Sequence, residues 1–259
     1  MGKNKLKKFA DMEMLPNVFQ CAMKDLGEDN PVVQMAGHWQ ERYFHNSHPI
    51  VLELGCGHGE YTVGLAQRYP DTNFIGIDIK GARMWHGARQ AFEQQLPNVA
   101  FLRINIELLP RFFAPNEVDE LWITFPDPQM KKATKRLTST FFLRRYAQLL
   151  KPNGLIHLKT DSPFLYTYTR AMLSENHFTP LADTDDLYAP ALQEAADLVN
   201  ARALQTHYEH QWLSRGLTIK YLCWALSPKQ PLIEPEIDIE KDTYRSYGRN
   251  YVAQEQPSK

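Results

Sequence analysis

Hydrophobic and polar positions form a regular alternating pattern from Pro49 onward. Short runs of apolar, β-prone residues alternate with longer stretches in which apolar residues recur at helical spacing. Strands are predicted at Ile50–Leu54, Asn73–Ile77, Val99–Ile104, Glu120–Phe125, Gly154–Thr160 and Leu217–Leu226, with a weaker pattern near Phe178. Helices are predicted at Glu60–Arg68, Gly81–Gln95, Thr138–Leu150, after Pro163, and at Ala191–Leu204.

Buried strands that alternate with helices imply right-handed crossovers and a mostly parallel sheet with helices on both faces. The pattern therefore predicts an α/β fold, a Rossmann-like, doubly wound sheet of about seven strands. Residues 49–228 form this domain. Residues 1–48 are read as a helical or extended N-terminal segment, and residues 229–259 as a polar, proline-bearing tail that is partly loose.

The composition excludes few classes of protein. The 259 residues carry a formal net charge of −1, so binding to nucleic acid would depend on local basic patches. Two such patches are Lys3, Lys5, Lys7 and Lys8, and Lys131, Lys132, Lys135 and Arg136. Each patch could equally be a solvent-exposed face or tail that binds nothing.

The three cysteines, Cys21, Cys56 and Cys223, are far apart and show no metal-binding spacing. They indicate a reducing compartment without disulfides. The basic start is not followed by an apolar run long enough for a signal peptide or a membrane span. We expect a cytoplasmic protein with no metal site and no membrane partner, either a monomer or a homodimer.

Candidate cofactor residues follow the first three strands. Glu53 precedes a glycine loop at Gly55, Gly57 and Gly59, and glycines there allow a sharp turn and close approach to a ligand. Asp78 ends the second strand, where a carboxylate can accept both ribose hydroxyls, and Asn105 follows the third. A carboxylate beside a pyrophosphate would repel it, whereas the ammonium and sulfonium of S-adenosylmethionine are attracted. A dinucleotide fold and a plain tight turn with chance acids remain as alternatives.

Two further acids follow the next strands. Asp127 lies between Pro126 and Pro128, which fix the backbone, and Asp161 follows the fifth strand. Asp161 is also readable as part of a helix N-terminus before Pro163. Methylation of guanine N7 uses an available lone pair, so it requires alignment and nearby negative charge rather than a general base. A cytosine-C5 enzyme would need a catalytic cysteine, and none of the three fits.

These motifs together resemble the bacterial tRNA (guanine-N7)-methyltransferase family, TrmB type. The match runs from about Ile50 to Leu226 and keeps the motifs in order. They are Glu53–Gly59, Gly76–Asp78, Phe125–Pro128, the basic run to Thr138, His157–Asp161 and Thr206–Glu209. The resemblance implies a class I methyltransferase fold, S-adenosylmethionine as cofactor and tRNA as partner.

The resemblance also implies residue roles. Glu53, Gly55, Gly57, Asp78, Asn105 and Asp127 would bind the cofactor, with Asp127 as the catalytic acid. Lys131, Asp161, Thr206 and Glu209 correspond to substrate-binding positions, and Lys132, Lys135 and Arg136 lie where the family contacts tRNA. Gln129 departs from the family's tryptophan and the basic run is shorter, which puts RNA binding in question more than cofactor binding.

Three functions are compatible with these residues. The first is methyl transfer to N7 of a guanine in tRNA, with the N-terminal lysines as an RNA arm. The second is a class I methyltransferase that acts on another substrate. The third is a catalytically weak RNA-binding paralogue, against which the intact Glu53, Asp78, Asp127 and Asp161 argue.

Overall fold

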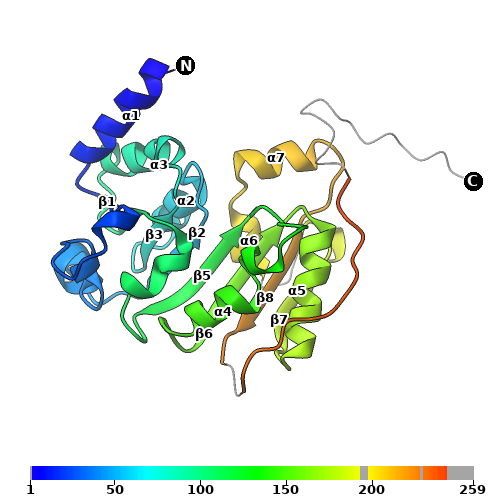
Figure 1. The fold of residues 1–259 in the computed structure, drawn as a ribbon. Coiled ribbons are helices and arrows are strands. Elements are labelled where there is room, and N and C mark those ends of the chain that lie inside the picture. The colour runs from blue at the N-terminus through cyan, green and yellow to red at the C-terminus, as the bar shows by residue number, and fades with distance from the viewer. Residues whose placement is uncertain (1, 193–197, 228–229, 244–259) are drawn as a thin grey trace, which may run out of the picture.

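A single eight-stranded sheet lies at the centre of the protein (Figure 1). The computed structural model describes residues 2–192, 198–227 and 230–243. The strands are β1 (Val18–Gln20), β2 (Ile50–Leu54), β3 (Asn73–Ile77), β4 (Val99–Arg103), β5 (Val118–Thr124), β6 (Leu150–Thr160), β7 (Pro180–Thr184) and β8 (Lys220–Ala225).

The strand order is β1-β4-β3-β2-β5-β6-β8-β7. Neighbours from β1 to β6 pair in parallel, whereas β8 is antiparallel to both β6 and β7. The chain reverses direction across the sheet at β2, where the order switches from β3 to β5. In open α/β sheets ligands bind at the carboxyl ends of the strands beside such a switch point.

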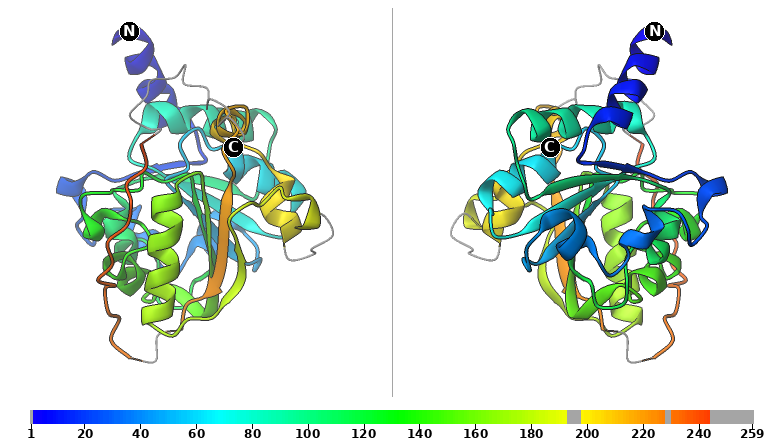
Figure 2. Two further views of the ribbon diagram at one scale, coloured as in Figure 1. Left: turned by 90° about the vertical axis from the view of Figure 1, so that its right-hand side faces the viewer. Right: turned by 90° about the vertical axis from the view of Figure 1, so that its left-hand side faces the viewer.

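Helices cover both faces of the sheet, as predicted (Figure 2). They are α1 (Gly2–Met14), α2 (Glu60–Arg68), α3 (Gly81–Glu93), α4 (Thr140–Tyr146), α5 (Pro163–Glu175), α6 (Val199–Ala203) and α7 (His207–Leu213). Shorter helical turns include the π-helical Trp39–Phe44 and the 3₁₀ helices Ile106–Arg111 and Ala133–Lys135.

Alternation along the strands divides the core into two clusters. On β2, Ile50, Leu52 and Leu54 pack with residues of α4 and α5, whereas Val51 packs with residues of α1, α2 and α3. Successive strand side chains point to opposite faces, so a central strand covered on both sides is apolar throughout. This explains why β2 is fully buried over its whole length.

The sequence prediction differs from the structure at several elements. The expected seven strands become eight, because Val18–Gln20 pairs with β4 at the edge of the sheet. The predicted helix Thr138–Leu150 ends at Tyr146, and β6 already begins at Leu150. The weak strand near Phe178 begins at Pro180. Within the predicted helix Ala191–Leu204 only Val199–Ala203 is α-helical, and residues 193–197 lie outside the described residues.

The N-terminal segment is part of the core rather than a separate unit. Trp39 is fully buried, and its indole Nε1 donates to the Phe112 carbonyl at 2.8 Å. Phe19 packs edge-on against Trp39 and Tyr43. Helix α1 contacts α3, while its N-terminal end points away from the rest of the molecule (Figures 1 and 2).

Residues 230–243 form an extended strap along α4 and α5 (Figure 2), and residues 244–259 of the predicted tail lie outside the described residues. Glu234 Oε2 accepts hydrogen bonds from the Thr140 hydroxyl at 2.7 Å and amide at 3.2 Å, and Tyr168 OH donates to Oε1. Asp242 is buried and accepts from Ser162 Oγ and from the Phe164 amide. The strap therefore covers the N-terminus of α5.

No helix within the described ranges combines the length and the apolar character needed to cross a membrane.

Candidate active site

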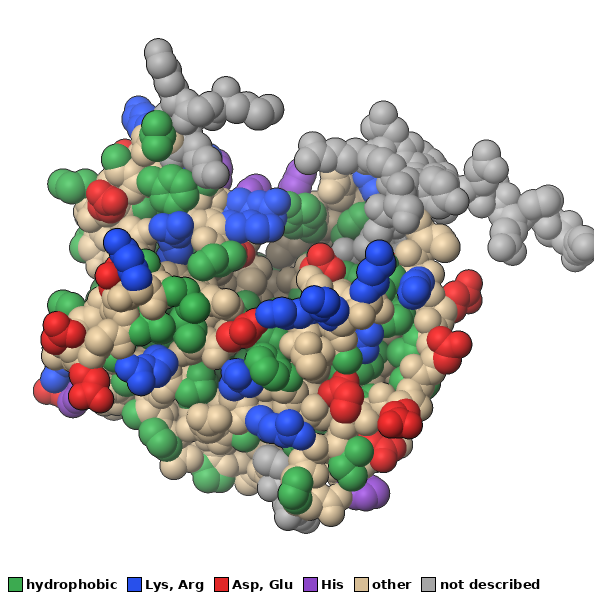
Figure 3. Space-filling model, viewed as in Figure 1, with side chains coloured by type: hydrophobic (Ala, Val, Ile, Leu, Met, Phe, Trp, Pro, Cys, Tyr) green, Lys and Arg blue, Asp and Glu red, His purple; other side chains and the backbone are tan. Residues whose placement is uncertain are grey.

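A cleft of about 520 Å³ opens at the carboxyl ends of β2, β3 and β5. Six of the predicted site residues line it, namely Glu53, Gly55, Gly57, Asp78, Asp127 and Thr206, together with Lys135 from the predicted RNA-contacting run. Figure 3 shows the hollow in this face, with Lys and Arg side chains gathered on both sides of it. Its volume is in the range of small-molecule and cofactor sites.

The glycine loop forms one wall of the cleft. Gly55, Gly57 and Gly59 have φ angles of 77°, 55° and 75°, in the left-handed region that favours glycine. A Cβ added at Gly55 would meet no atom within 4 Å, and one at Gly57 only the Gly55 carbonyl at 3.9 Å. The loop backbone is therefore open to the cleft, where a ligand can approach it closely.

Asp78 is fixed beside this loop by two backbone hydrogen bonds. Its Oδ2 accepts from the Gly57 amide at 3.0 Å, and its Oδ1 accepts from the Lys80 amide at 2.8 Å. Each carboxylate oxygen retains a second acceptor position. The half-buried carboxylate at the end of β3 is thus oriented to accept hydroxyl groups in the cleft.

Glu53 lies deeper, at the floor of the cleft, and is buried. Its Oε2 accepts from the Thr62 amide at 2.8 Å and hydroxyl at 2.5 Å, and its Oε1 accepts from the Thr124 hydroxyl at 2.7 Å. Burial raises the pKa of Glu53 to about 7, although these hydrogen bonds lower it. Glu53 therefore joins β2 to α2 and β5 directly under the glycine loop.

Asp127 lies on an exposed turn after β5 and also lines the cleft. Its Oδ1 accepts from the Gln129 amide at 3.0 Å. Phe125 and Gln129 have φ angles of 48° and 46°, which is uncommon for residues other than glycine. Such strained positions cluster at functional sites, and these two residues flank the carboxylate predicted to be catalytic.

Asn105 is not among the residues that line the cleft. Its Oδ1 accepts from the Glu107 amide at 3.2 Å and caps the 3₁₀ helix Ile106–Arg111. The adjacent Ile106 lines the cleft instead, with Ile79. An apolar side chain is thus present where the sequence predicted an amide.

The basic run 131–136 divides into exposed and buried members. Lys131 and Lys132 are exposed, and Lys135 forms an ion pair with Glu107 at 2.5 Å. Arg136 turns inward, donates to the carbonyls of Gln129 and Met130, and stacks over Phe164 and Tyr168. The guanidinium supports the turn that carries Asp127 rather than facing solvent.

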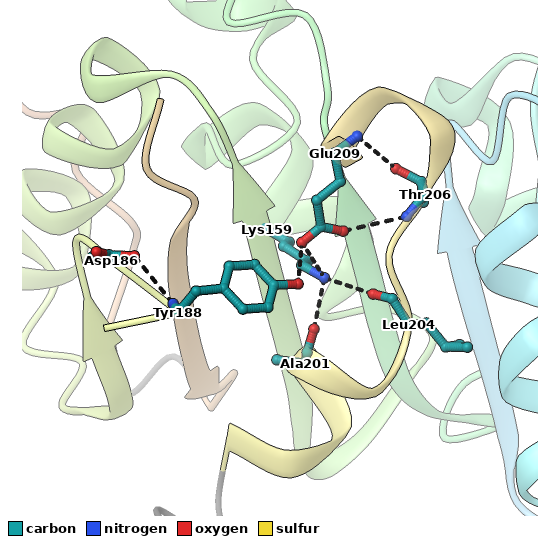
Figure 4. Close-up of polar contacts among 7 residues, drawn as sticks. All are labelled: Lys159, Asp186, Tyr188, Ala201, Leu204, Thr206 and Glu209. Atoms are coloured by element: carbon teal, nitrogen blue, oxygen red, sulfur yellow. Dashed lines mark hydrogen bonds and ion pairs between the residues drawn. The ribbon is translucent and has the colours of Figure 1, made fainter. Parts of the chain in front are cut away.

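The remaining predicted substrate residues are buried. Asp161 is fully buried at the end of β6. Thr206 and Glu209 form a capping box at the start of α7, and Thr206 also lines the cleft. Glu209 is fully buried and does not line the cleft; its Oε1 forms an ion pair with Lys159 Nζ at 2.8 Å (Figure 4).

Several cleft residues were missed by the sequence analysis. They are His58, Lys80, Arg83, Tyr208 and Trp212. Tyr208 is part of the Thr206–Glu209 motif, so that motif could have identified it as a site residue. Helix periodicity gave no signal for Arg83 or Trp212, because a side chain at a cleft rim looks like any other exposed helical position.

The burial of the cysteines argues against a role for them as catalytic nucleophiles. All three are buried free thiols. Cys56 lies in the glycine loop, where burial, Glu53 and Asp78 all raise its thiol pKa. The thiolate is the reactive form of cysteine, so this thiol is a poor nucleophile.

The sheet order, the glycine loop and the acids after β3 and β5 on a single cleft define a class I methyltransferase. A 16S rRNA methyltransferase, KamB, has a similar fold, with a TM-score of 0.55 and 19% identity over 73% of this chain and 92% of that one. At this identity the likeness concerns the fold.

The chain belongs to the putative methyltransferase family, whose model matches residues 47–222, and within it to the tRNA (guanine-N(7)-)-methyltransferases. It is 54% identical to the protein of that name from Bacteroides thetaiotaomicron, over the whole of both chains. It is 55% identical to the one from Porphyromonas gingivalis, covering 95% of this chain and all of that one.

Proposed function

We propose that this protein transfers the methyl group of S-adenosylmethionine to N7 of a guanine in tRNA. One observation carries the proposal: Asp127, the glycine loop and Asp78 all line a single cleft. Relatives named for this activity match the whole chain at more than half identity. Cytoplasmic location, where tRNA is processed, is part of the same proposal.

The cleft fits this cofactor at three points. The open backbone at Gly55 and Gly57 leaves room for its amino-acid end, and Asp78 offers acceptors for ribose hydroxyls. Ile79 and Ile106 provide apolar surface for an adenine ring. Negative charge from Asp78 and Asp127 favours a cationic ligand without phosphate.

S-adenosylmethionine supplies an electrophilic methyl group on a sulfonium. The acceptor atom, guanine N7, has a free lone pair and no proton, so no residue of the protein would have to act as a base. Asp127, held by Pro126, Pro128 and the Gln129 amide, would accept hydrogen bonds from the base and offset the positive charge that develops on it. Alignment and charge would supply the catalysis.

Two parts of the surface would meet the RNA. Lys131 and Lys132 are exposed near the Asp127 turn. On the other side of the cleft, Lys8 of α1 contacts His86, whose ring lies 5.1 Å from that of cleft residue His58. We propose phosphate contacts for these lysines, whereas Arg136 is engaged within the protein.

Incubation with methyl-labelled S-adenosylmethionine and unmodified tRNA, followed by nucleoside analysis, tests the proposal. N7-methylguanosine is the expected product. Asp127→Ala should lose turnover while cofactor affinity falls modestly, and Asp78→Ala should weaken cofactor binding directly. Cofactor binding without methylated guanosine would leave a class I methyltransferase with another substrate, and wild-type rates for Asp127→Ala would remove the role of Asp127.

A further inference from the structure

A buried lysine lies beneath the wall of the cleft formed by α7. Lys159 Nζ, at the end of β6, is fully buried and makes an ion pair with Glu209 Oε1 at 2.8 Å. It also donates to the carbonyls of Ala201 at 2.6 Å and Leu204 at 2.9 Å. An ammonium has three donors, so these three acceptors satisfy it completely.

Glu209 is equally engaged (Figure 4). Its Oε1 also accepts from Tyr188 OH at 2.5 Å, and its Oε2 accepts from the Thr206 amide at 3.3 Å. In return the Glu209 amide donates to Thr206 Oγ1 at 3.2 Å. We call Lys159, Tyr188 and Glu209 the α7 anchor. It connects β6, the segment after β7, the end of α6 and the start of α7.

The anchor lies under the substrate side of the cleft. The glycine loop and Asp78 follow β2 and β3, Asp127 follows β5, and the anchor is attached to β6, one strand further from the cofactor residues. Three residues at the start of α7 and along it line the cleft, namely Thr206, Tyr208 and Trp212. The position of that wall is therefore fixed by the ion pair beneath it.

The buried ion pair of the anchor is better suited to orienting the α6–α7 segment than to stabilising the fold. Replacing a buried ion pair with apolar residues is often neutral or stabilising, while removing one partner leaves a costly lone charge. Hydrogen bonds from a buried ammonium are directional, however, and allow one placement of the α6–α7 segment. Glu209 itself is 0% exposed and does not line the cleft, so it has no direct access to a bound RNA.

We propose that Lys159 and Tyr188 are positioning residues, which act through Glu209 to hold the α7 wall against the base of the RNA substrate. The inference rests on the proposed function. Glu209 then acts on the substrate from beneath the wall rather than by contact.

The test uses the full-length protein with Lys159→Met combined with Glu209→Gln, so that neither charge is left alone. Lys151→Met is the matched control, because Lys151 is on the same strand and pairs with Asp119 at 2.7 Å, but is 42% exposed. The double variant should keep a melting temperature near that of wild type and a cofactor Kd within about twofold. Its KM for tRNA should rise at least tenfold, whereas the control changes neither.

Tyr188→Phe, which removes one hydrogen bond to Glu209, should raise the KM for tRNA in the same direction by a smaller factor. An unchanged KM for tRNA in the double variant would overturn the proposal. So would a loss of cofactor affinity equal to the loss for tRNA, because that indicates general loosening.

Amide hydrogen exchange without RNA separates the two proposals. Residues 204–213 should exchange faster in the double variant than in the Lys151→Met control, and equal exchange would overturn the anchor. A wild-type protein that does not methylate tRNA overturns the proposed function, while the exchange result still decides the anchor.

Discussion

Individual carboxylates in the cleft differ sharply in environment. Asp78 and Asp127 lie where solvent reaches them, whereas Glu53 is enclosed by Thr62 and Thr124. Desolvation disfavours the charged form of an acid, and this effect exceeds the opposing hydrogen bonds at Glu53. A group at the floor of the cleft therefore changes charge near neutral pH.

This environment predicts a pH dependence of stability. Between pH 4.5 and about 7 the folded protein retains the Glu53 proton and the unfolded chain does not, so the contribution of this group falls as pH rises. The protonated Glu53 contributes its full share to the free energy of unfolding below pH 4.5, and this share is lost as the pH rises to about 7. It amounts to about 3 kcal/mol.

The measurement is the free energy of unfolding of wild type and Glu53→Gln at several pH values. As the pH rises, the free energy of unfolding of wild type should fall by about 3 kcal/mol relative to that of Glu53→Gln. A difference that stays constant with pH would show that Glu53 has an ordinary pKa in the folded state.

For single residues, the sequence predicted which side chains lie at the cleft better than it predicted their contacts. Gly55, Asp78 and Asp127 were found because residues that follow parallel strands gather at one edge of the sheet. The burial of Glu209 could not be foreseen, because its partners Lys159 and Tyr188 come from other elements. Arg136 is a similar case, since its aromatic partners lie on α5.

Among the elements, the ordered strap of residues 230–243 could not be located from the sequence. It has neither helical nor strand periodicity, so nothing in its pattern predicted an ordered position. Its order comes from tertiary contacts, such as Leu232, which is buried, and Glu234. The edge strand β1 was missed for a related reason, because three residues are too short to show alternation.

Glu234 gives a direct test of the strap. Replacement with Ala removes the acceptor for Thr140 and Tyr168, which are both buried, and should lower the free energy of unfolding by about 1–3 kcal/mol. Chemical denaturation measures this loss. Glu236→Ala, an exposed position two residues away, is the matched control and should change stability little.

Over the whole molecule, charge is balanced but unevenly placed. The formal net charge is −1, yet Lys and Arg side chains gather around the cleft (Figure 3). A polyanion would therefore be attracted to this face in particular. Such attraction depends on salt, because each neutralised phosphate releases counterions.

Replacing both Lys131 and Lys132 with Ala should weaken tRNA binding and make it less sensitive to salt. The slope of log K against log salt should fall in magnitude by about 1.4 to 1.8 for two lost phosphate contacts. Binding titrations at several salt concentrations provide the slope. Lys151→Ala, near the start of β6 and outside the cleft lining, should leave the slope unchanged. An unchanged slope in the double variant would exclude both lysines from the interface.

The position of β8 has a consequence for biosynthesis. Although β8 is the last strand among the described residues, it lies between β6 and β7 and pairs with both. A nascent chain that ends before Lys220 has α7 but carries β6 with a bare edge and β7 without its neighbour. Bare strand edges are prone to pair with other chains. We therefore expect the half of the sheet beneath the α7 wall to close only after residues 220–225 have been synthesised, when the glycine-loop half has already formed.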